Sequence, residues 1–172
     1  MKDINFNNDV CDEITFKKLF QSLGKQLFKF LYLKYQNEEF AREGMQEAFI
    51  TLWNNCKKVP ESKAKNYVFT VGRNRVVDIL RRNKKNLRIS KDEFFVEEEH
   101  ANDIDENKKR KINYILSIMP QASKEAFLMN RVQGLKYAEI AEELDISIKA
   151  VEKRMSKALE IIKNELNKGR VF

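Results

Sequence analysis

The stretch from Leu135 to Leu159 has the pattern of a helix-turn-helix motif, and it constrains the fold more than any other part of the chain. It reads LKYAEIAEELDISIKAVEKRMSKAL. Apolar residues recur at helical spacing on both sides of a short polar break. In the first helix we expect the inward positions to be Ala138, Ile140, Ala141 and Leu144. Two short helices joined in this way commonly place the second helix in a DNA groove.

The break between the two helices contains residues suited to a tight turn. Asp145 and Ile146 are expected to form the turn, and aspartate is one of the few residues that tolerate a left-handed backbone. Ser147 is expected to cap the second helix, because its hydroxyl can accept a hydrogen bond from a free amide of the first turn.

The second helix separates an apolar side from a basic side. The apolar positions predicted to face the core are Val151, Met155, Ala158, Leu159 and Ile162. The basic residues Lys149, Lys153, Arg154 and Lys157 fall mainly on the other side. Lys149, Ala150 and Lys153 are predicted to lie nearest the bases, because the first turns of such a helix approach them most closely. The alternative is a solvated basic face on a helical hairpin, which explains the charges but not the capped turn.

Composition favours an all-α protein. The chain has 172 residues with only five glycines and two prolines, so the residues that punctuate strands and turns are sparse. This length suits one sizeable domain or two small ones.

Charge is distributed in blocks along the chain. The net charge of +7 divides into −1 for residues 1–55, +10 for 56–91, −8 for 92–107 and +6 for 108–172. Two basic blocks on either side of an acidic spacer indicate a polyanion partner, because each neutralised phosphate releases counterions. We find no long apolar run and no signal peptide, and expect a cytoplasmic protein without membrane insertion.

Cysteine and histidine usage gives no support to a metal site or a cofactor. Cys11 and Cys56 are isolated, so we expect reduced thiols. His100, the only histidine, lies among acidic residues and is expected to be solvated.

The first half of the chain predicts three helices. Asp12 can cap a helix that runs to about Tyr35, and a second helix is expected over Phe40–Asn55. The predicted buried sides are Phe16, Leu19, Phe20, Leu23, Leu27, Phe30 and Leu31 in the first, and Ala41, Met45, Ala48, Phe49, Leu52 and Trp53 in the second. The outer side of the second helix carries Glu39, Glu43, Gln46, Glu47 and Asn54. This side is either an ordinary solvated surface or a docking face for a basic partner helix.

The third helix is expected to start with Ser62 as its cap, after Pro60, and to reach about Arg82. Its cations, amides and aromatic rings suit single-stranded DNA, because an unpaired base can stack on a ring while its backbone attracts positive charge. The residues concerned include Lys63, Lys65, Asn66, Tyr67, Phe69, Arg73, Asn74, Arg75, Arg81 and Arg82. Alternatively, Tyr67 and Phe69 are core aromatics.

These segments together resemble the bacterial RNA polymerase sigma factors of the extracytoplasmic-function (ECF) group. FAREGMQEAFITLWNN resembles the segment that binds core polymerase, on which Glu43, Gln46 and Glu47 fall. Phe49, Leu52 and Trp53 match the same segment, whereas Arg42 and Gly44 depart from it. The resemblance implies two helical domains, an acidic linker, promoter DNA and core RNA polymerase as partners, and an anti-sigma factor.

The DNA-binding segments of that family also have counterparts. NYVFTVGRNRVVDILRRNKK is similar to the segment that opens and reads the downstream element, and Tyr67 stands where the family has tryptophan. The downstream residues that we predict are Lys63, Asn66, Tyr67, Phe69, Arg73, Asn74, Arg81 and Arg82. The upstream residues are Lys149, Ala150, Lys153, Arg154 and Lys157. The family's arginine near Ser123 and threonine at Ala150 are absent.

The resemblance implies a polymerase-binding and melting domain over residues 1–88, an acidic linker over 89–107 and an upstream-element domain over 108–172. Two rival functions are a free-standing helix-turn-helix regulator and a nucleic-acid enzyme. The first would need a dimer interface or a receiver domain, and no strand pattern of a receiver is present. The second lacks a phosphate loop, a metal-spaced carboxylate set and a usable histidine, so we expect a protein that is not an enzyme.

Overall fold

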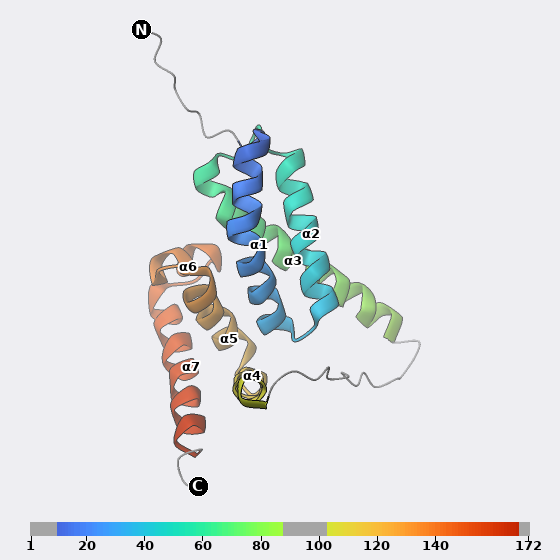
Figure 1. The fold of residues 1–172 in the computed structure, drawn as a ribbon. Helices are drawn as coiled ribbons and strands as arrows, with labels where there is room; N and C mark the ends of the chain where they lie inside the picture. Colours follow the sequence, from blue (N-terminus) through green and yellow to red (C-terminus); the bar gives the residue numbers. More distant parts are fainter. Residues whose placement is uncertain (1–9, 88–102, 169–172) are drawn as a thin grey trace. The chain divides into compact units, whose positions relative to one another are not determined.

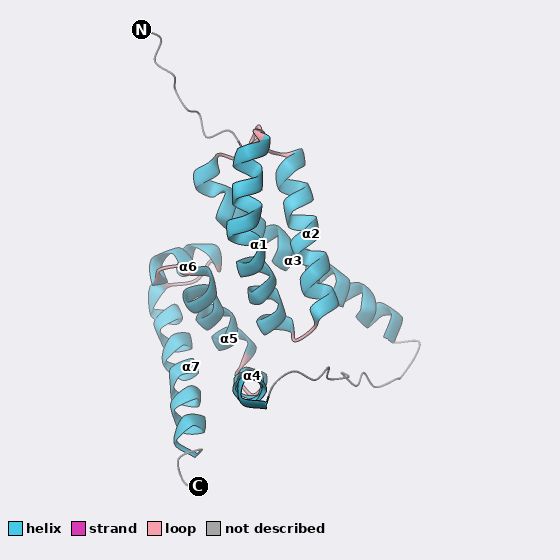
Figure 2. Ribbon diagram, viewed as in Figure 1, coloured by secondary structure: helices cyan, strands magenta, loops and turns pink. Residues whose placement is uncertain are grey.

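The computed structural model of the chain describes residues 10–87 and 103–168, and within these ranges every regular element is a helix (Figures 1 and 2). The chain divides into two units, Met1–Asp92 and Glu93–Phe172. The predicted all-α fold with two helical domains is therefore confirmed. The acidic linker predicted over 89–107 lies outside the described residues as far as residue 102, and residues 103–107 are helical.

The first unit consists of three long helices, α1 (Glu13–Tyr35), α2 (Glu38–Asn54) and α3 (Glu61–Leu87). Figure 1 shows α1 and α2 side by side, with α3 crossing them. Large side chains from all three helices close the core, which includes Leu27, Phe30, Leu31, Leu52, Val68 and Val76. The apolar stripes seen in the sequence therefore meet in one core.

Side chains cap the first turns of α1 and α2. The Asp12 carboxylate accepts a hydrogen bond from the Thr15 amide at 2.8 Å, which confirms the predicted cap of α1 and lowers the pKa of Asp12. Asn37 caps α2 in the same way, through the Phe40 amide. The prediction that Ser62 caps the third helix was wrong, because α3 begins at Glu61 and Ser62 lies within its first turn.

Two glycines allow α2 and α3 to approach closely. A Cβ atom on Gly44 would lie 2.9 Å from both Leu31 Cδ1 and Val76 Cγ2, and 3.0 Å from the carbonyl oxygen of Gly72. A Cβ atom on Gly72 would lie 3.1 Å from the carbonyl oxygen of Gly44. Each glycine thus faces the backbone of the other helix. This contact explains why a glycine occupies position 44, where the chain departs from the ECF segment.

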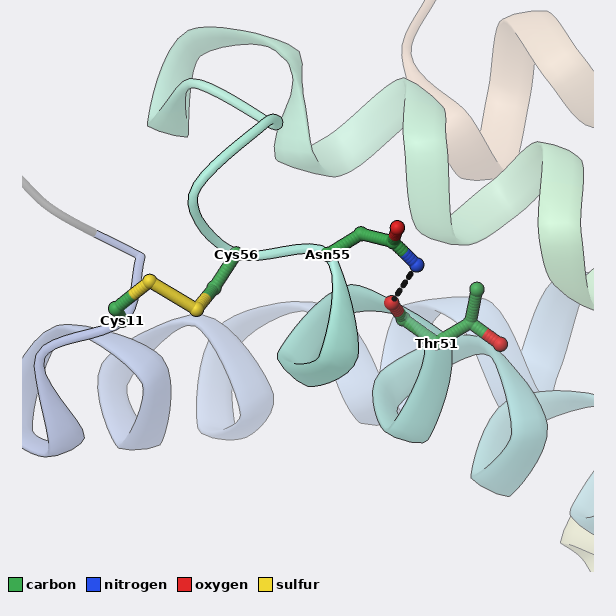
Figure 3. Close-up of a disulfide and its surroundings, with 4 residues drawn as sticks. All are labelled: Cys11, Thr51, Asn55 and Cys56. Atoms are coloured by element: carbon green, nitrogen blue, oxygen red, sulfur yellow. Dashed lines mark hydrogen bonds between the residues drawn. A yellow bond between two sulfur atoms is a disulfide. The ribbon is translucent and has the colours of Figure 1, made fainter.

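The expectation of free thiols was wrong, because Cys11 and Cys56 form a disulfide (Figure 3). Their Cα atoms are 5.0 Å apart. Cys11 immediately precedes the start of α1, and Cys56 lies in the turn after α2, where Asn55 Nδ2 donates to the Thr51 carbonyl oxygen at 2.9 Å. Antiparallel packing of α1 and α2 brings these two positions together, which sequence separation alone does not reveal.

The second unit contains α4 (Asp103–Ser117), α5 (Gln121–Leu128), the π-helical turn η1 (Met129–Gln133), α6 (Tyr137–Glu143) and α7 (Ile148–Lys168). Both α5 and α6 pack on α7. The core of this unit includes Ile115, Leu128, Met129, Ile140, Val151, Met155 and Ala158. Gly134 ends η1 in the left-handed region with φ of 77°, a backbone conformation that glycine adopts readily.

We expect Gly44→Ala to lower the free energy of unfolding of the first unit by about 1–3 kcal/mol, because the added methyl group forces α2 away from α3. Urea unfolding followed by the fluorescence of Trp53, the only tryptophan, would measure this change.

The matched control is Gly24→Ala, whose Cβ atom would lie 3.9 Å from Met45 Sδ, which is an ordinary van der Waals contact. Since alanine favours a helix over glycine, this control should raise the free energy of unfolding by about 0.5–1 kcal/mol. Equal stability of Gly44→Ala and the wild type would contradict the tight crossing.

Candidate protein and nucleic-acid interfaces

The outer side of α2 carries the three residues predicted to bind polymerase. Gln46 is exposed, while Glu43 and Glu47 are partly exposed, on the side opposite the buried Ala48 and Leu52. Helical spacing places the three side chains within one face, which we call the α2 docking face (Glu43, Gln46 and Glu47). The structure brings them together as predicted; their role remains a prediction.

Glu43 also has a partner inside the unit that sequence reasoning missed. Arg75 of α3 donates from Nε to Glu43 Oε1 at 3.1 Å, and its Nη2 also contacts that oxygen. Both side chains remain partly exposed, at 29% for Arg75 and 42% for Glu43. The sequence grouped Arg75 with the cations around the DNA segment, because nothing local indicates that it turns towards α2.

An apolar groove lies between α1 and α2, next to the α2 docking face. We call it the aromatic groove, and its lining includes Phe16, Phe20, Met45, Phe49, Ile50 and Trp53. The rings of Phe16 and Trp53 are 4.9 Å apart, as are those of Phe20 and Phe49. Phe20 and Trp53 are each 44% exposed, so the prediction that both are buried was wrong. Their helical stripes extend beyond the core and line a surface groove.

The outer side of α3 presents most of the residues predicted to bind the downstream element. Lys63, Tyr67, Asn74 and Arg81 recur at steps of four and seven residues, so they share one helix face. Asn66 and Arg73 lie beside this face. We call these six residues the α3 outer face. Arg82 is exposed on a neighbouring side, and Arg81 lies 3.5 Å from Asp78.

Phe69 does not belong to the α3 outer face. Its side chain is only 2% exposed, and its ring packs against that of Phe30, with 5.4 Å between the centroids. A base cannot stack on a ring that the core covers, so the predicted DNA-binding role of Phe69 was wrong. Helical spacing puts residue 69 on the side of α3 that also carries the buried Val76.

The helix-turn-helix forms at the predicted residues. Asp145 has a left-handed backbone with φ of 50°, and the Ser147 hydroxyl accepts a hydrogen bond from the Ala150 amide at 3.2 Å. Ile140 and Ala141 are buried against α7, as predicted. Two inward predictions were wrong, since Ala138 and Leu159 are exposed.

The exposed side of α7 is basic. Lys149, Lys153 and Lys157 follow one another at four-residue steps, and all three are exposed. We call them the α7 basic face. Ala150 and Arg154 flank it and are half-buried, and Lys157 Nζ also contacts Glu160 at 3.0 Å. Long cations on one side of the second helix match the needs of major-groove binding.

Both units match models of the same protein family. Residues 19–86 match sigma-70 region 2, and residues 109–162 match sigma-70 region 4, so the two models together span more than half of the chain. The chain is an ECF-type sigma factor of the sigma-70 family. In this sigma factor, region 2 lies on α1–α3, and region 4 extends from α4 to α7.

Two bacterial proteins are similar to this sigma factor along most of their length. The ECF RNA polymerase sigma factor SigM of Bacillus subtilis (strain 168) is 23% identical over 159 residues, which cover 91% of this chain and 98% of SigM. The ferric citrate uptake sigma factor FecI of Escherichia coli (strain K12) is 25% identical over 152 residues, which cover 86% and 88%.

Two solved structures have a similar fold. The sigma factor RpoE from Bartonella quintana, solved in complex with the anti-sigma factor NepR, superposes with a TM-score of 0.71 at 16% identity, covering 88% of this chain and 96% of RpoE. CnrH, solved in complex with the cytosolic domain of CnrY, gives a TM-score of 0.66 at 18% identity, covering 94% and 93%.

One cation near the helix-turn-helix of this sigma factor is unsuited to a phosphate contact. Lys124 of α5 follows Ser123, where the family often has an arginine nearby, but it is only 6% exposed. Burial lowers the pKa of Lys124 by disfavouring its charged form. Lys124 therefore does not replace the missing arginine.

Across residues 10–87 and 103–168, no three histidine, cysteine or acidic side chains gather in a group able to hold a metal ion. Within the same ranges no helix has the length and apolar character needed to span a membrane.

Proposed function

We propose that this sigma factor binds core RNA polymerase and directs it to specific promoters, where it starts transcription. The observation that carries the proposal is the presence of region 2 and region 4 on one chain, each with an exposed face of suitable chemistry. A free-standing regulator is not favoured, because it leaves the region 2 match over residues 19–86 without a role.

The α2 docking face is our candidate for binding core polymerase. It offers two carboxylates and an amide beside the aromatic groove, so it suits a partner helix with basic and apolar side chains. Charge complementarity of this kind steers association and fixes the orientation of the partner.

Replacing Glu47 by lysine should weaken binding to core polymerase by roughly 30-fold or more, because a like charge then faces the basic partner. Glu142→Lys is the matched control: it makes the same charge change at an exposed position of α6, in the other unit. We expect the control to bind normally. Normal affinity of a well-folded Glu47→Lys protein would remove Glu47 from the docking face.

The α3 outer face is our candidate for holding the separated strand of the downstream element. It combines cations for the backbone with amides for base edges and a tyrosine ring for stacking. Capture of an unpaired base offsets the unstacking cost of a few kcal/mol.

Tyr67→Ala should leave promoter binding intact but reduce opening, because an unstacked base then lacks its flat partner. Permanganate reactivity of thymines in the polymerase–promoter complex measures the opening. Tyr67→Phe keeps the ring and should open the promoter normally. Full reactivity with Tyr67→Ala would exclude the stacking role.

The α7 basic face, with Ala150 and Arg154 beside it, is our candidate for reading the upstream duplex. Lys153→Ala should weaken binding to the upstream duplex and reduce the slope of log affinity against log salt by about 1, because one cation close to the DNA is lost. Lys163→Ala removes an exposed lysine ten residues further along α7, and we expect it to bind as the wild type does. Identical salt slopes for the two variants would contradict the assignment of Lys153.

The remaining assignments complete the proposal. Residues 1–88 would form the polymerase-binding and melting domain, residues 89–107 a tether, and residues 108–172 the upstream domain. A tether raises the effective concentration of the second domain once the first has bound. We further propose a cytoplasmic, non-enzymatic protein that requires no cofactor and is held inactive by an anti-sigma factor, because the similar RpoE was solved with one.

Run-off transcription with purified core polymerase and a pool of genomic promoters tests the function as a whole. We expect transcripts from a small subset of promoters, and only when the sigma factor is present. A protein that never joins core polymerase, or that joins it without starting RNA synthesis at any promoter, would refute the proposal.

A further inference from the structure

The chain contains only two cysteines, and the structure joins them. A permanent disulfide is unusual in a protein that works beside RNA polymerase, because the cell interior keeps thiols reduced. Disulfides in such proteins are mostly transient and serve catalysis or redox sensing. The bridge between Cys11 and Cys56 is therefore expected to form and break, and not to be a permanent structural cross-link.

The surroundings of the bridge suit repeated opening and closing. Both cysteines are partly exposed, so the bridge lies at the surface of the unit and not in its core. Each lies close to a buried anchor, Val10 at 1% exposure and Val59 at 8%. These buried side chains tie the two backbone segments to the core at points separate from the bridge. The reduced thiols consequently stay close enough to pair again.

The bridge also lies at one end of the aromatic groove. Phe16 follows Cys11 by five residues, Trp53 precedes Cys56 by three, and the two rings are in contact at 4.9 Å. The bridge thus joins the chain segments that carry this ring pair. Reduction removes the covalent link between the start of α1 and the turn after α2 while Val10 and Val59 stay on the core, so Phe16 and Trp53 lose one constraint on their separation. A groove held in its bound shape loses less entropy when a partner docks.

We propose that Cys11 and Cys56 form a reversible oxidation site for hydroperoxides, and that the bridged form preorganises the aromatic groove for core polymerase. The second half of this statement rests on the proposed function, because the groove adjoins the α2 docking face. The first half stands on the cysteine pair alone.

The chemistry balances in two steps. A thiolate attacks the hydroperoxide, and a sulfur–oxygen bond forms as the O–O bond breaks, which gives a sulfenic acid. The leaving oxygen takes up the proton that the thiol had released and departs as alcohol or water. The second thiol then attacks the sulfenic sulfur, forms the S–S bond and releases water. Two electrons pass from the cysteine pair to the peroxide. A dithiol reductant returns them by thiol–disulfide exchange through a mixed disulfide.

Neighbouring charges favour Cys56 as the first thiol to react. Lysines occupy positions 57 and 58, directly after Cys56, whereas acidic residues occupy positions 12 and 13, directly after Cys11. Positive neighbours favour the thiolate, which is the form that attacks a peroxide. Cys11 then acts as the resolving thiol.

Mass spectrometry of the full chain tests the oxidation site. The protein is reduced with dithiothreitol, freed of reductant and treated with hydrogen peroxide at near-equal concentration. We expect an intramolecular bridge between Cys11 and Cys56 that dithiothreitol reverses. In the Cys11→Ser variant we expect a sulfenic acid on Cys56 that dimedone traps. Absence of the bridge in the wild type, or dimers in its place, would overturn the site, and trapping only on Cys11 in Cys56→Ser would overturn the order of attack.

Trp53 provides a direct readout of the groove, since it is the only tryptophan. We expect acrylamide quenching of its fluorescence to differ between the bridged and reduced forms, and the bridged form to bind core polymerase roughly fivefold more tightly. The double variant Cys11→Ser/Cys56→Ser is the control, and peroxide should change neither quantity in it.

Equal quenching and equal affinity in the two redox forms of the wild type would overturn the coupling while leaving the proposed function intact. Failure of both forms to bind core polymerase would instead refute the proposed function. In that case the bridge mapping and the Trp53 quenching still decide whether the cysteine pair is an oxidation site that acts on the groove.

Discussion

The close approach of α2 and α3 at Gly44 and Gly72 determines how the first unit presents its surfaces. With no side chain at either position, each helix rests on the backbone of the other, and Leu31 of α1 fills the space beside them. The contact fixes the inner side of both helices at once. Consequently the α2 docking face and the α3 outer face are both turned outward. One small helical unit thus has two separate surfaces, which we propose for a protein and for a DNA strand.

Features that depend on a few neighbouring residues could be predicted from the sequence. The caps at Asp12 and Ser147, the left-handed turn at Asp145 and the end of η1 at Gly134 all follow from the chemistry of one to four residues. The α7 basic face followed from helical periodicity for the same reason. Local hydrogen bonding and helix geometry decide these features whatever surrounds them.

Features that depend on distant parts of the chain could not be predicted in this way. The disulfide requires the start of α1 to meet the turn after α2, and the Arg75–Glu43 pair requires α3 to cross α2. Phe69 was predicted to be at the surface and is buried, whereas Trp53 was predicted to be buried and is exposed. Both are aromatic residues in amphipathic helices. Phe30 of α1 packs against the ring of Phe69, which is buried, whereas Trp53 lies at the edge of the α1–α2 pair and is exposed.

The ion pair between Glu43 and Arg75 has a consequence for docking. In the docking that we propose, a basic side chain of core polymerase would exchange with Arg75 at the Glu43 carboxylate, one oxygen of which receives both guanidinium contacts. Partly exposed pairs of this kind contribute only about 0–1 kcal/mol, so the exchange of one cation for another costs little. Arg75 belongs to α3, the helix that we propose for holding the opened strand. Under this proposal, docking of core polymerase would free a guanidinium on the same helix that attracts the nucleic acid.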